Sequence, residues 1–221
     1  MLQSRIPYLI LSSCLLVILS CSPAQKQMRS APDSYREADI SILQKFRPAF
    51  TVALYNTTVD VMGNHLSGLL LIKKMPDSST RMVFSSETGL TFFDFEFAAD
   101  GNFKVHSIIK KMNKRSVIKT LQHDFELILM NRLDNNTATV KTDNSQGPAD
   151  GLLYFIFPQK KGFNYYITNT DGTELVRMER ASNKKTIVEA VMKNYINGIP
   201  DTIGISHKTF EFNIGLKRIE R

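Results

Sequence analysis

The feature that most limits how this chain can fold is a change in the spacing of its apolar residues near residue 50. In the segment TFFDFEF, residues 91–97, phenylalanine occupies every second position from Phe93 to Phe97, and the two positions between are acidic. A repeat of two residues is the repeat of a β-strand whose two faces meet different surroundings. Because several segments share this pattern, the sequence predicts a mainly β protein.

Turn signals divide the first part of this region into five strands, at 50–61, 65–74, 81–87, 91–97 and 103–112. Consecutive strands joined by short turns pair as an antiparallel meander. One possible short strand lies at 137–142, and further strand patterns follow at 152–157, 163–168, 173–179, 186–195, 202–208 and 210–219. The segment TIVEAVMKNY also fits a helix. We expect a single antiparallel sheet of about 10 to 11 strands.

Two helices are predicted beside the sheet. The segment SYRE matches a capping box, with Ser34 at the N-cap and Glu37 at N3, and Pro48 ends that helix. A second helix opens at Asn113, and its apolar residues share one side: Val117, Leu121, Phe125, Ile128 and Leu129. A sheet of this size usually curls, closes or splits, and strands such as GLLLI have no polar face. We therefore expect a curved sheet whose faces are both covered.

Residues 1–20 have the pattern of a secretory signal peptide. Their apolar run, residues 6–19, is shorter than the stretch of about 20 apolar residues that a membrane-spanning helix needs. Arg5 precedes the run and the small residue Ser20 ends it, as in a signal peptide. A buried core helix is the alternative, but core helices keep a polar face and this run has none.

The segment ILSC, residues 18–21, resembles the lipobox of bacterial lipoproteins. The resemblance implies cleavage after Ser20 and acylation of Cys21 with a diacylglycerol, so that the membrane becomes a partner through Cys21. Two or more acyl chains hold a protein firmly at a membrane. Ser22 follows the cysteine, which by the same resemblance implies the outer membrane, facing the periplasm. Residues 21–33 are then a polar tether, and residues 34–221 form a single β domain.

The charges and motifs of the chain point away from catalysis. The chain has 28 Lys and Arg against 21 Asp and Glu, an excess that suits solubility, anionic lipid or nucleic acid. The expected compartment argues against nucleic acid. No metal-ligand spacing, nucleophile elbow or phosphate loop occurs in the sequence. We expect no enzyme activity, no metal and no cofactor.

Two pairs of ionisable residues are candidates for acid–base chemistry. Asp94 and Glu96 share a face of one strand, and His123 directly precedes Asp124. Paired groups of this kind can transfer protons. On the polar side of a strand or helix, however, they are more often simply solvated, and we expect that here.

Phenylalanine and methionine are the residues that most suggest a ligand. The chain has 14 Phe and 9 Met but no Trp, and Phe and Met suit a flexible apolar pocket. The candidates for lining an apolar cavity are Phe93, Phe95, Phe97, Phe155, Phe157, Phe210, Phe212 and Ile214. A packed core is the alternative, and both interpretations stay open at this point.

The order of these elements resembles the LolA/LolB-like lipoproteins. It runs helix, meander, central helix and further strands, with SGLLLIKK at 67–74 and VFSSETGLTFFDFEF at 83–97. The resemblance covers residues 34–221 and implies a half-barrel sheet with helices on its concave face, where acyl chains are received. It implies a periplasmic, outer-membrane lipoprotein that binds the acyl chains of a lipid or lipoprotein. The alternative is a non-enzymatic assembly or structural lipoprotein that binds an envelope protein.

A basic segment surrounds the expected start of the second helix. Five of the ten residues 110–119 are Lys or Arg, although cations are unfavourable at the positive end of a helix. One hypothesis is that Lys111, Lys114 and Arg115 face an anionic partner, such as a lipid headgroup phosphate, at free backbone N–H groups. The alternative is a solvated basic turn with its side chains splayed outward.

Overall fold

A single antiparallel sheet of 13 strands dominates the computed structural model, which describes residues 36–37, 39–131, 133, 138–143 and 151–219. These residues belong to one unit, residues 35–221. The predicted signal peptide, with Ser20, and the predicted tether, with the acylation site Cys21, lie outside the described residues.

Two consecutive runs of strands make up the sheet. In sheet order the strands are β1 (Arg36–Glu37), β7 (Thr139–Asp143), β8 (Leu152–Pro158), β9 (Phe163–Asn169), β10 (Leu175–Ala181), β11 (Thr186–Ile196), β12 (Ile199–His207), β13 (Phe212–Arg218), β2 (Val52–Val61), β3 (Asn64–Lys74), β4 (Thr80–Ser85), β5 (Thr91–Phe97) and β6 (Phe103–Ile108). The last strand, β13, pairs with β2, which places Ile214 opposite Val59. That pairing joins the run β7–β13 to the run β2–β6.

The predicted fold class is confirmed. The five-strand meander expected between residues 50 and 112 is β2–β6, and TIVEAVMKNY lies in strand β11 and not in a helix. Two short strands at one edge, β1 and β7, account for the larger number of strands in the described residues.

The short helix predicted between Ser34 and Pro48 is present, but its predicted start is wrong. Among the described residues of this region only α2 (Ser41–Gln44) is helical, while Arg36 and Glu37 form β1. Their backbones pair with Val140 and Thr139 of β7. Pairing at the sheet edge gives this backbone the partners that a capping box would have given it, so a tertiary contact overrides the local signal.

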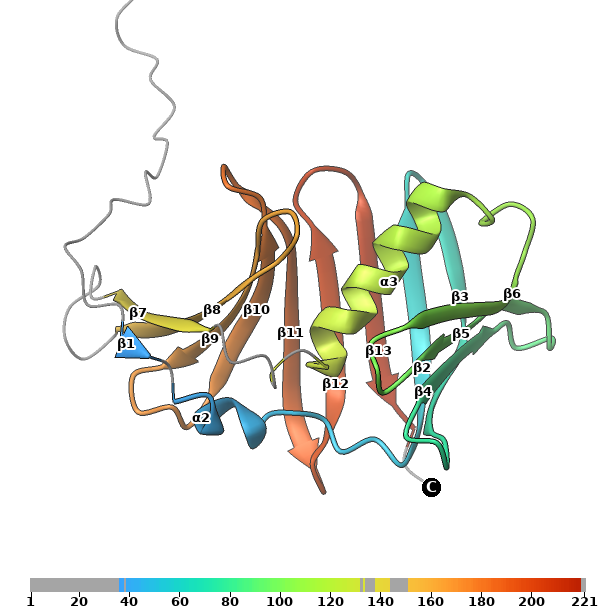
Figure 1. The fold of residues 1–221 in the computed structure, drawn as a ribbon. Helices are drawn as coiled ribbons and strands as arrows, with labels where there is room; N and C mark the ends of the chain where they lie inside the picture. Colours follow the sequence, from blue (N-terminus) through green and yellow to red (C-terminus); the bar gives the residue numbers. More distant parts are fainter. Residues whose placement is uncertain (1–35, 38, 132, 134–137, 144–150, 220–221) are drawn as a thin grey trace, which may run out of the picture. The chain divides into compact units, whose positions relative to one another are not determined.

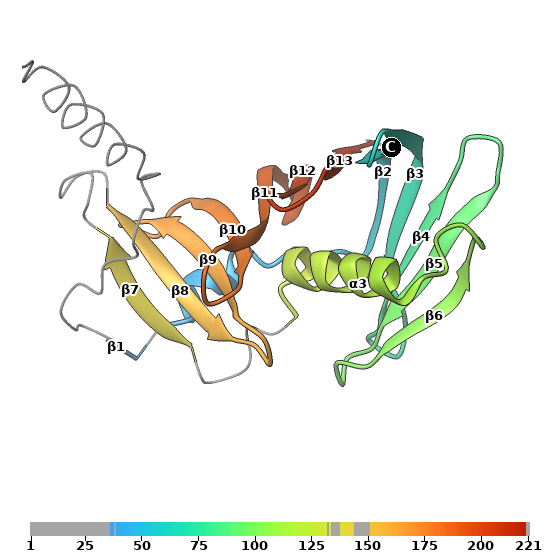
Figure 2. The same cartoon turned by 90° about the horizontal axis from the view of Figure 1, so that it is seen from above.

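The longer helix, α3 (Arg115–Leu129), crosses the concave face of the sheet (Figure 1). Viewed from above, strands on both sides of α3 curve around it (Figure 2). The helix begins after Lys114, which gives no side-chain cap, and ends at Met130, whose φ of 52° is left-handed. One side of α3 is buried: Leu121, Asp124, Phe125, Leu127, Ile128 and Leu129. The expectation of a helix on the concave face is therefore met by α3.

Candidate functional site

Aromatic rings from β5 and α3 meet on one half of the concave face. The rings of Phe93 and Phe95 stack with their centroids 4.4 Å apart. Phe125 of α3 lies 5.7 Å from Phe93 and 6.4 Å from Phe97, in both cases between ring centroids. The period of two in β5 points these phenylalanines inward, and the helical spacing points Phe125 toward them. The sequence thus builds an aromatic contact between the helix and the sheet.

The other half of the concave face also contacts α3. Phe157 of β8 packs edge-on against Tyr166 of β9, with ring centroids 5.3 Å apart. The Tyr166 hydroxyl donates a hydrogen bond of 3.5 Å to the carbonyl oxygen of Leu127 in α3. The helix therefore bridges the two halves of the sheet.

The structure brings seven of the eight predicted apolar residues into a single buried cluster. They are Phe93, Phe95, Phe97, Phe155, Phe157, Phe212 and Ile214, and none of their side chains is more than 6% exposed. Phe210 differs, because it lies in the connection after β12 and is 44% exposed. With α3 in this position the seven side chains belong to a packed core, and Phe93 and Phe97 contact the helix through Phe125.

A hollow of about 290 Å³ opens at one end of the sheet, beside the end of α3. Its lining includes Lys74 next to the β3–β4 connection, Glu126 of α3, and Phe97. Since Phe97 also contacts Phe125, the hollow lies next to the aromatic packing under the helix. A second hollow, of about 380 Å³, lies on the outer face of the sheet over Gly204 and Gly215.

Three ionisable side chains, two buried and one partly exposed, meet where α3 packs on β10 and β12. Asp124 of α3 and Nε2 of His207 are 2.7 Å apart, and both side chains are at most 1% exposed. A guanidinium nitrogen of Arg180 lies 4.0 Å from the other oxygen of Asp124. Burial lowers the pKa of Arg180, and the carboxylates of Asp124 and Glu126 oppose that shift. Charged contacts as well as apolar packing therefore fix α3 on the sheet.

The expectation that His123 and Asp124 both lie on the helix surface is half wrong. His123 is on the surface, with 47% of its side chain exposed. Asp124 is buried because it lies three residues after Leu121 and four before Ile128, on the buried side of the helix. That spacing is the signal in the sequence that could have identified it.

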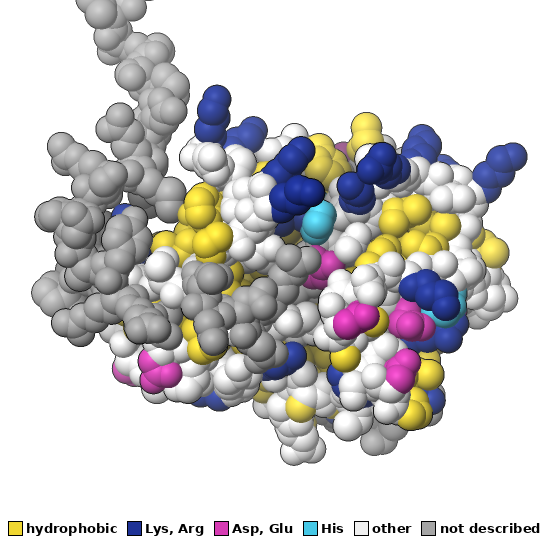
Figure 3. All heavy atoms as spheres, viewed as in Figure 1, with side chains coloured by type: hydrophobic (Ala, Val, Ile, Leu, Met, Phe, Trp, Pro, Cys, Tyr) yellow, Lys and Arg dark blue, Asp and Glu magenta, His cyan; other side chains and the backbone are white. Residues whose placement is uncertain are grey.

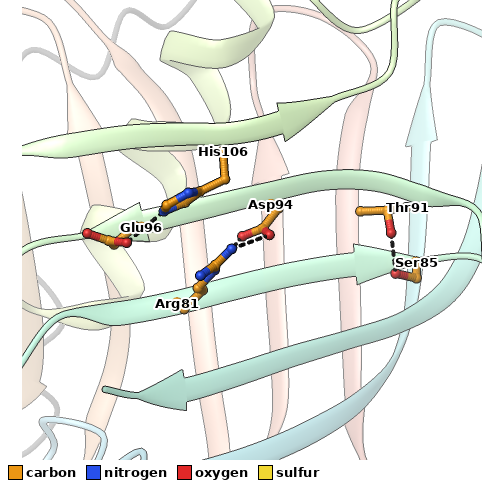
Figure 4. A network of polar contacts seen from close by, with 6 residues as sticks. All are labelled: Arg81, Ser85, Thr91, Asp94, Glu96 and His106. Carbon is orange, nitrogen blue, oxygen red and sulfur yellow. Dashed lines mark hydrogen bonds and ion pairs between the residues drawn. The ribbon is translucent and has the colours of Figure 1, made fainter. Parts of the chain in front are cut away.

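The acidic pair of β5, Asp94 and Glu96, lies on the outer face (Figure 4). The expectation that both carboxylates are simply solvated is wrong, because each has a partner on a neighbouring strand. Asp94 accepts two hydrogen bonds from Arg81 of β4, at 2.8 and 2.7 Å. Glu96 contacts His106 of β6 at 2.6 Å. The two carboxylates therefore tie β5 to its neighbours on either side, and neither lines one of the two hollows.

The basic residues predicted to meet an anion surround the start of α3. Lys111 lies in the connection 109–114, Lys114 immediately precedes the helix, and Arg115 is its first residue. All three are exposed, and Nζ of Lys111 donates to the side-chain oxygen of Asn64 at 3.4 Å. The first turn of α3 has no acidic residue. The backbone N–H groups there are accompanied only by cations, so this end of the helix favours an anion.

Within the residues that the structure describes, no three His, Cys, Asp or Glu side chains gather closely enough to hold a metal ion. None of the helices in the same ranges has the length and apolar character to span a membrane.

Comparison with solved structures identifies the fold. A LolA superfamily protein from Nitrosomonas europaea superposes with a TM-score of 0.50 at 8% identity, over 81% of this chain and 90% of that one. A Vibrio parahaemolyticus domain named for outer membrane lipoprotein sorting gives 0.49 at 8% identity, over 82% and 90%. A DUF1329 family protein from Desulfovibrio piger gives 0.44 at 10% identity, over 82% and 88%. The chain has a LolA-like fold.

Sequence comparisons add no relative. No family model matches the chain, and no curated protein matches it.

Proposed function

We propose that this protein binds the acyl chains of a lipid or lipoprotein between α3 and the concave face of its sheet, in envelope lipid or lipoprotein transport. The observation that carries the proposal is that the apolar face of the sheet is much wider than the helix that covers it. The concave face is apolar from β8 to β5, yet a single 15-residue helix crosses it. The LolA-like fold supports the same assignment, because the resemblance to the LolA/LolB-like lipoproteins implies that acyl chains are received on this face.

Binding requires α3 to move, because the predicted apolar residues are already packed beneath it. Separating the helix from the sheet exposes apolar surface at a cost of about 25 cal/mol per Å². An acyl chain that takes the place of the helix buries comparable surface and offsets that cost. The hollow beside Phe97 and Glu126 is where a chain would first reach the aromatic cluster.

The anchor completes the proposal. We infer that Cys21 carries the lipid that holds the protein on the outer membrane, facing the periplasm, while residues 21–33 give the domain reach. Labelling with radioactive palmitate tests this inference: wild-type protein should be labelled and the Cys21→Ser variant should not. Labelling of the variant would refute lipidation at Cys21 and leave acyl-chain binding untouched.

A fluorescent fatty-acid probe tests acyl-chain binding with the unlipidated Cys21→Ser protein. We expect saturable uptake that is lost on Phe212→Glu, because a carboxylate on the concave face repels an acyl chain. Asn213→Glu is the matched control, since it places the same charge one residue away on the outer face, where Asn213 is exposed. Circular dichroism establishes that both variants are folded.

Binding of an envelope protein is the alternative function, and one observation favours it. With α3 in place the concave face is filled, and β6 is an edge strand with exposed side chains at Lys104, His106 and Ser107. Edge strands are ready templates for pairing with another chain. An absence of saturable probe uptake by folded wild-type domain would favour this alternative.

A further inference from the structure

Six connections lie at the same end of the sheet, because successive strands run in opposite directions. We call them the basic rim: residues 62–63, 86–90, 109–114, 159–162, 182–185 and 208–211. The basic rim carries two acidic residues, Glu87 and Glu211, against eight lysines. The lysines are Lys110, Lys111, Lys114, Lys160, Lys161, Lys184, Lys185 and Lys208. Figure 3 shows dark blue Lys and Arg side chains gathered along the upper edge, where several of these connections lie in Figure 1.

The strand connections at the opposite end of the sheet carry acidic residues instead, although Lys45, Arg47 and Lys74 lie close to them. The four described connections at this end, residues 75–79, 98–102, 170–174 and 197–198, contain four acidic residues and neither Lys nor Arg. Three of these acids shape their own turns. Asp77, Asp100 and Asp171 each accept a hydrogen bond from the backbone N–H two residues later, at 2.9, 2.9 and 3.1 Å. Among the described strand connections, the lysines are therefore confined to the basic rim.

The lysines of the basic rim have almost no partners inside the protein. All eight are exposed. Among the described residues, only Lys208 forms an ion pair, with Glu189 at 3.3 Å, and Lys111 donates to Asn64. Like charges that repel one another without internal compensation are best explained by an external anion.

Apolar side chains protrude from the middle of the same rim. Met62, Leu90 and Phe210 are 73, 56 and 44% exposed. Their connections join β2–β3, β4–β5 and β12–β13, which are neighbours in the sheet order. Lysine-bearing connections flank them, with those after β8 and β10 on one side and 109–114 on the other. Exposed apolar side chains flanked by lysines are complementary to a surface that is anionic on the outside and apolar beneath.

We propose that the basic rim docks the protein on a bilayer that contains anionic phospholipid, with Met62, Leu90 and Phe210 reaching into the headgroup layer. Lysines near such a surface are attracted by its negative potential, and exposed apolar side chains add burial below it. The α3 N-terminus belongs to the same surface and adds partial positive charge. This inference goes beyond acyl-chain binding, since the rim lies outside the concave face and does not require α3 to move.

Co-sedimentation with lipid vesicles tests the docking, using full-length Cys21→Ser protein so that no acyl anchor contributes. We expect binding to phosphatidylcholine vesicles that contain phosphatidylglycerol, little binding to phosphatidylcholine alone, and a loss of binding at high salt. Lys184→Glu with Lys185→Glu should weaken partitioning roughly tenfold or more, since each lysine contributes about fivefold. Lys114→Glu with Arg115→Glu should do the same.

The matched control is Lys73→Glu with Lys193→Glu, which changes net charge equally on exposed strand positions near the opposite end. It should retain nearly wild-type binding. Met62→Ser with Leu90→Ser should weaken binding while leaving its salt dependence unchanged, because no charge is removed.

Three results would overturn the proposal: no preference for anionic vesicles, equal losses in the rim and control variants, or undiminished binding by both rim charge variants. A lack of preference for anionic vesicles would instead indicate that the basic rim binds a soluble protein. Because vesicle binding is read without a fatty-acid probe, failure of docking and failure of acyl-chain binding are separate outcomes.

Discussion

A single buried side chain, that of Asp124, helps to fix how α3 lies over the sheet. It contacts His207 at 2.7 Å and lies 4.0 Å from Arg180, on two strands of the C-terminal half. Apolar packing alone is non-directional, so it would leave the helix free to slide or rotate on the sheet. The contacts of Asp124 with His207 and Arg180 are directional, so they favour one orientation of α3 on the sheet.

Replacing Asp124 with Leu should lower the free energy of unfolding by about 2–4 kcal/mol, because the buried His207 and the partly exposed Arg180 are left without their carboxylate. Urea unfolding at neutral pH measures this change. His123→Ala, next to it on the exposed side, should shift stability by less than about 0.5 kcal/mol. Adding His207→Leu to the Asp124 variant should recover part of the loss; a double variant with fully additive losses would contradict the proposed coupling.

Asp171 gives a prediction for acid. The Thr173 hydroxyl and backbone N–H donate to its carboxylate at 2.7 and 3.1 Å and hold the pKa of Asp171 below its usual range. A lowered folded-state pKa stabilises the protein above the unfolded pKa of about 3.9, and this stabilisation is lost as pH falls through the folded value. The melting temperature of Asp171→Asn should therefore fall less steeply than that of wild type below about pH 4. Identical acid dependence would show that the turn contributes nothing.

Strand pairing is the main contact at the scale of elements, and Gly68 shows how close it is. A Cβ atom built at Gly68 of β3 would lie 2.1 Å from the carbonyl oxygen of Ser85 in β4. Strands β4 and β5 shift register next to Ser85, so the backbone bends at this point. Only a residue without a side chain lets β4 approach β3 here.

Gly68→Ala should therefore destabilise the protein by about 2 kcal/mol or more. Gly204→Ala is the matched control, because a Cβ atom there has nothing within 4 Å and the backbone is an ordinary strand. That variant should be neutral or more stable by up to about 1 kcal/mol. Chemical denaturation of the two variants side by side decides the matter, and equal effects would contradict this account of β3–β4 pairing.

The sequence predicts most strands of this fold because a period of two and a turn signal are local properties. β5 is visible as alternating Phe and acid, and the meander follows from short connections. The pairing of β1 with β7, and of β13 with β2, joins segments far apart in the chain and has no local signal. The helix start predicted at Ser34 is wrong for that reason.

The site is predictable to a similar degree. Strand periodicity identifies the inward face of Phe93, Phe95 and Phe97, but not which helix packs on it. The basic segment at 110–119 is visible in the sequence. The structure places this segment at the same end of the sheet as Lys160, Lys184 and Lys208. That placement depends on the direction and order of the strands, which the sequence does not give.

At the scale of the whole molecule, the described unit has a lysine-bearing end, an end with acidic turns, and a concave face between them under α3. The hollow beside Phe97 opens at the acidic-turn end, next to residues 98–102. A protein docked through its basic rim would therefore present this hollow to the aqueous side. In that orientation an acyl chain delivered from the aqueous side would reach the concave face without first crossing the bilayer surface.

The most direct test of acyl-chain binding is photo-crosslinking with a diazirine-labelled fatty acid, followed by mass spectrometry of the labelled peptides. The account predicts saturable labelling in β5, β8 or β13, around Phe95, Phe155 or Phe212, and its loss when unlabelled fatty acid is added. Labelling confined to the outer face of the sheet or to the basic rim, with no competition by unlabelled fatty acid, would contradict it.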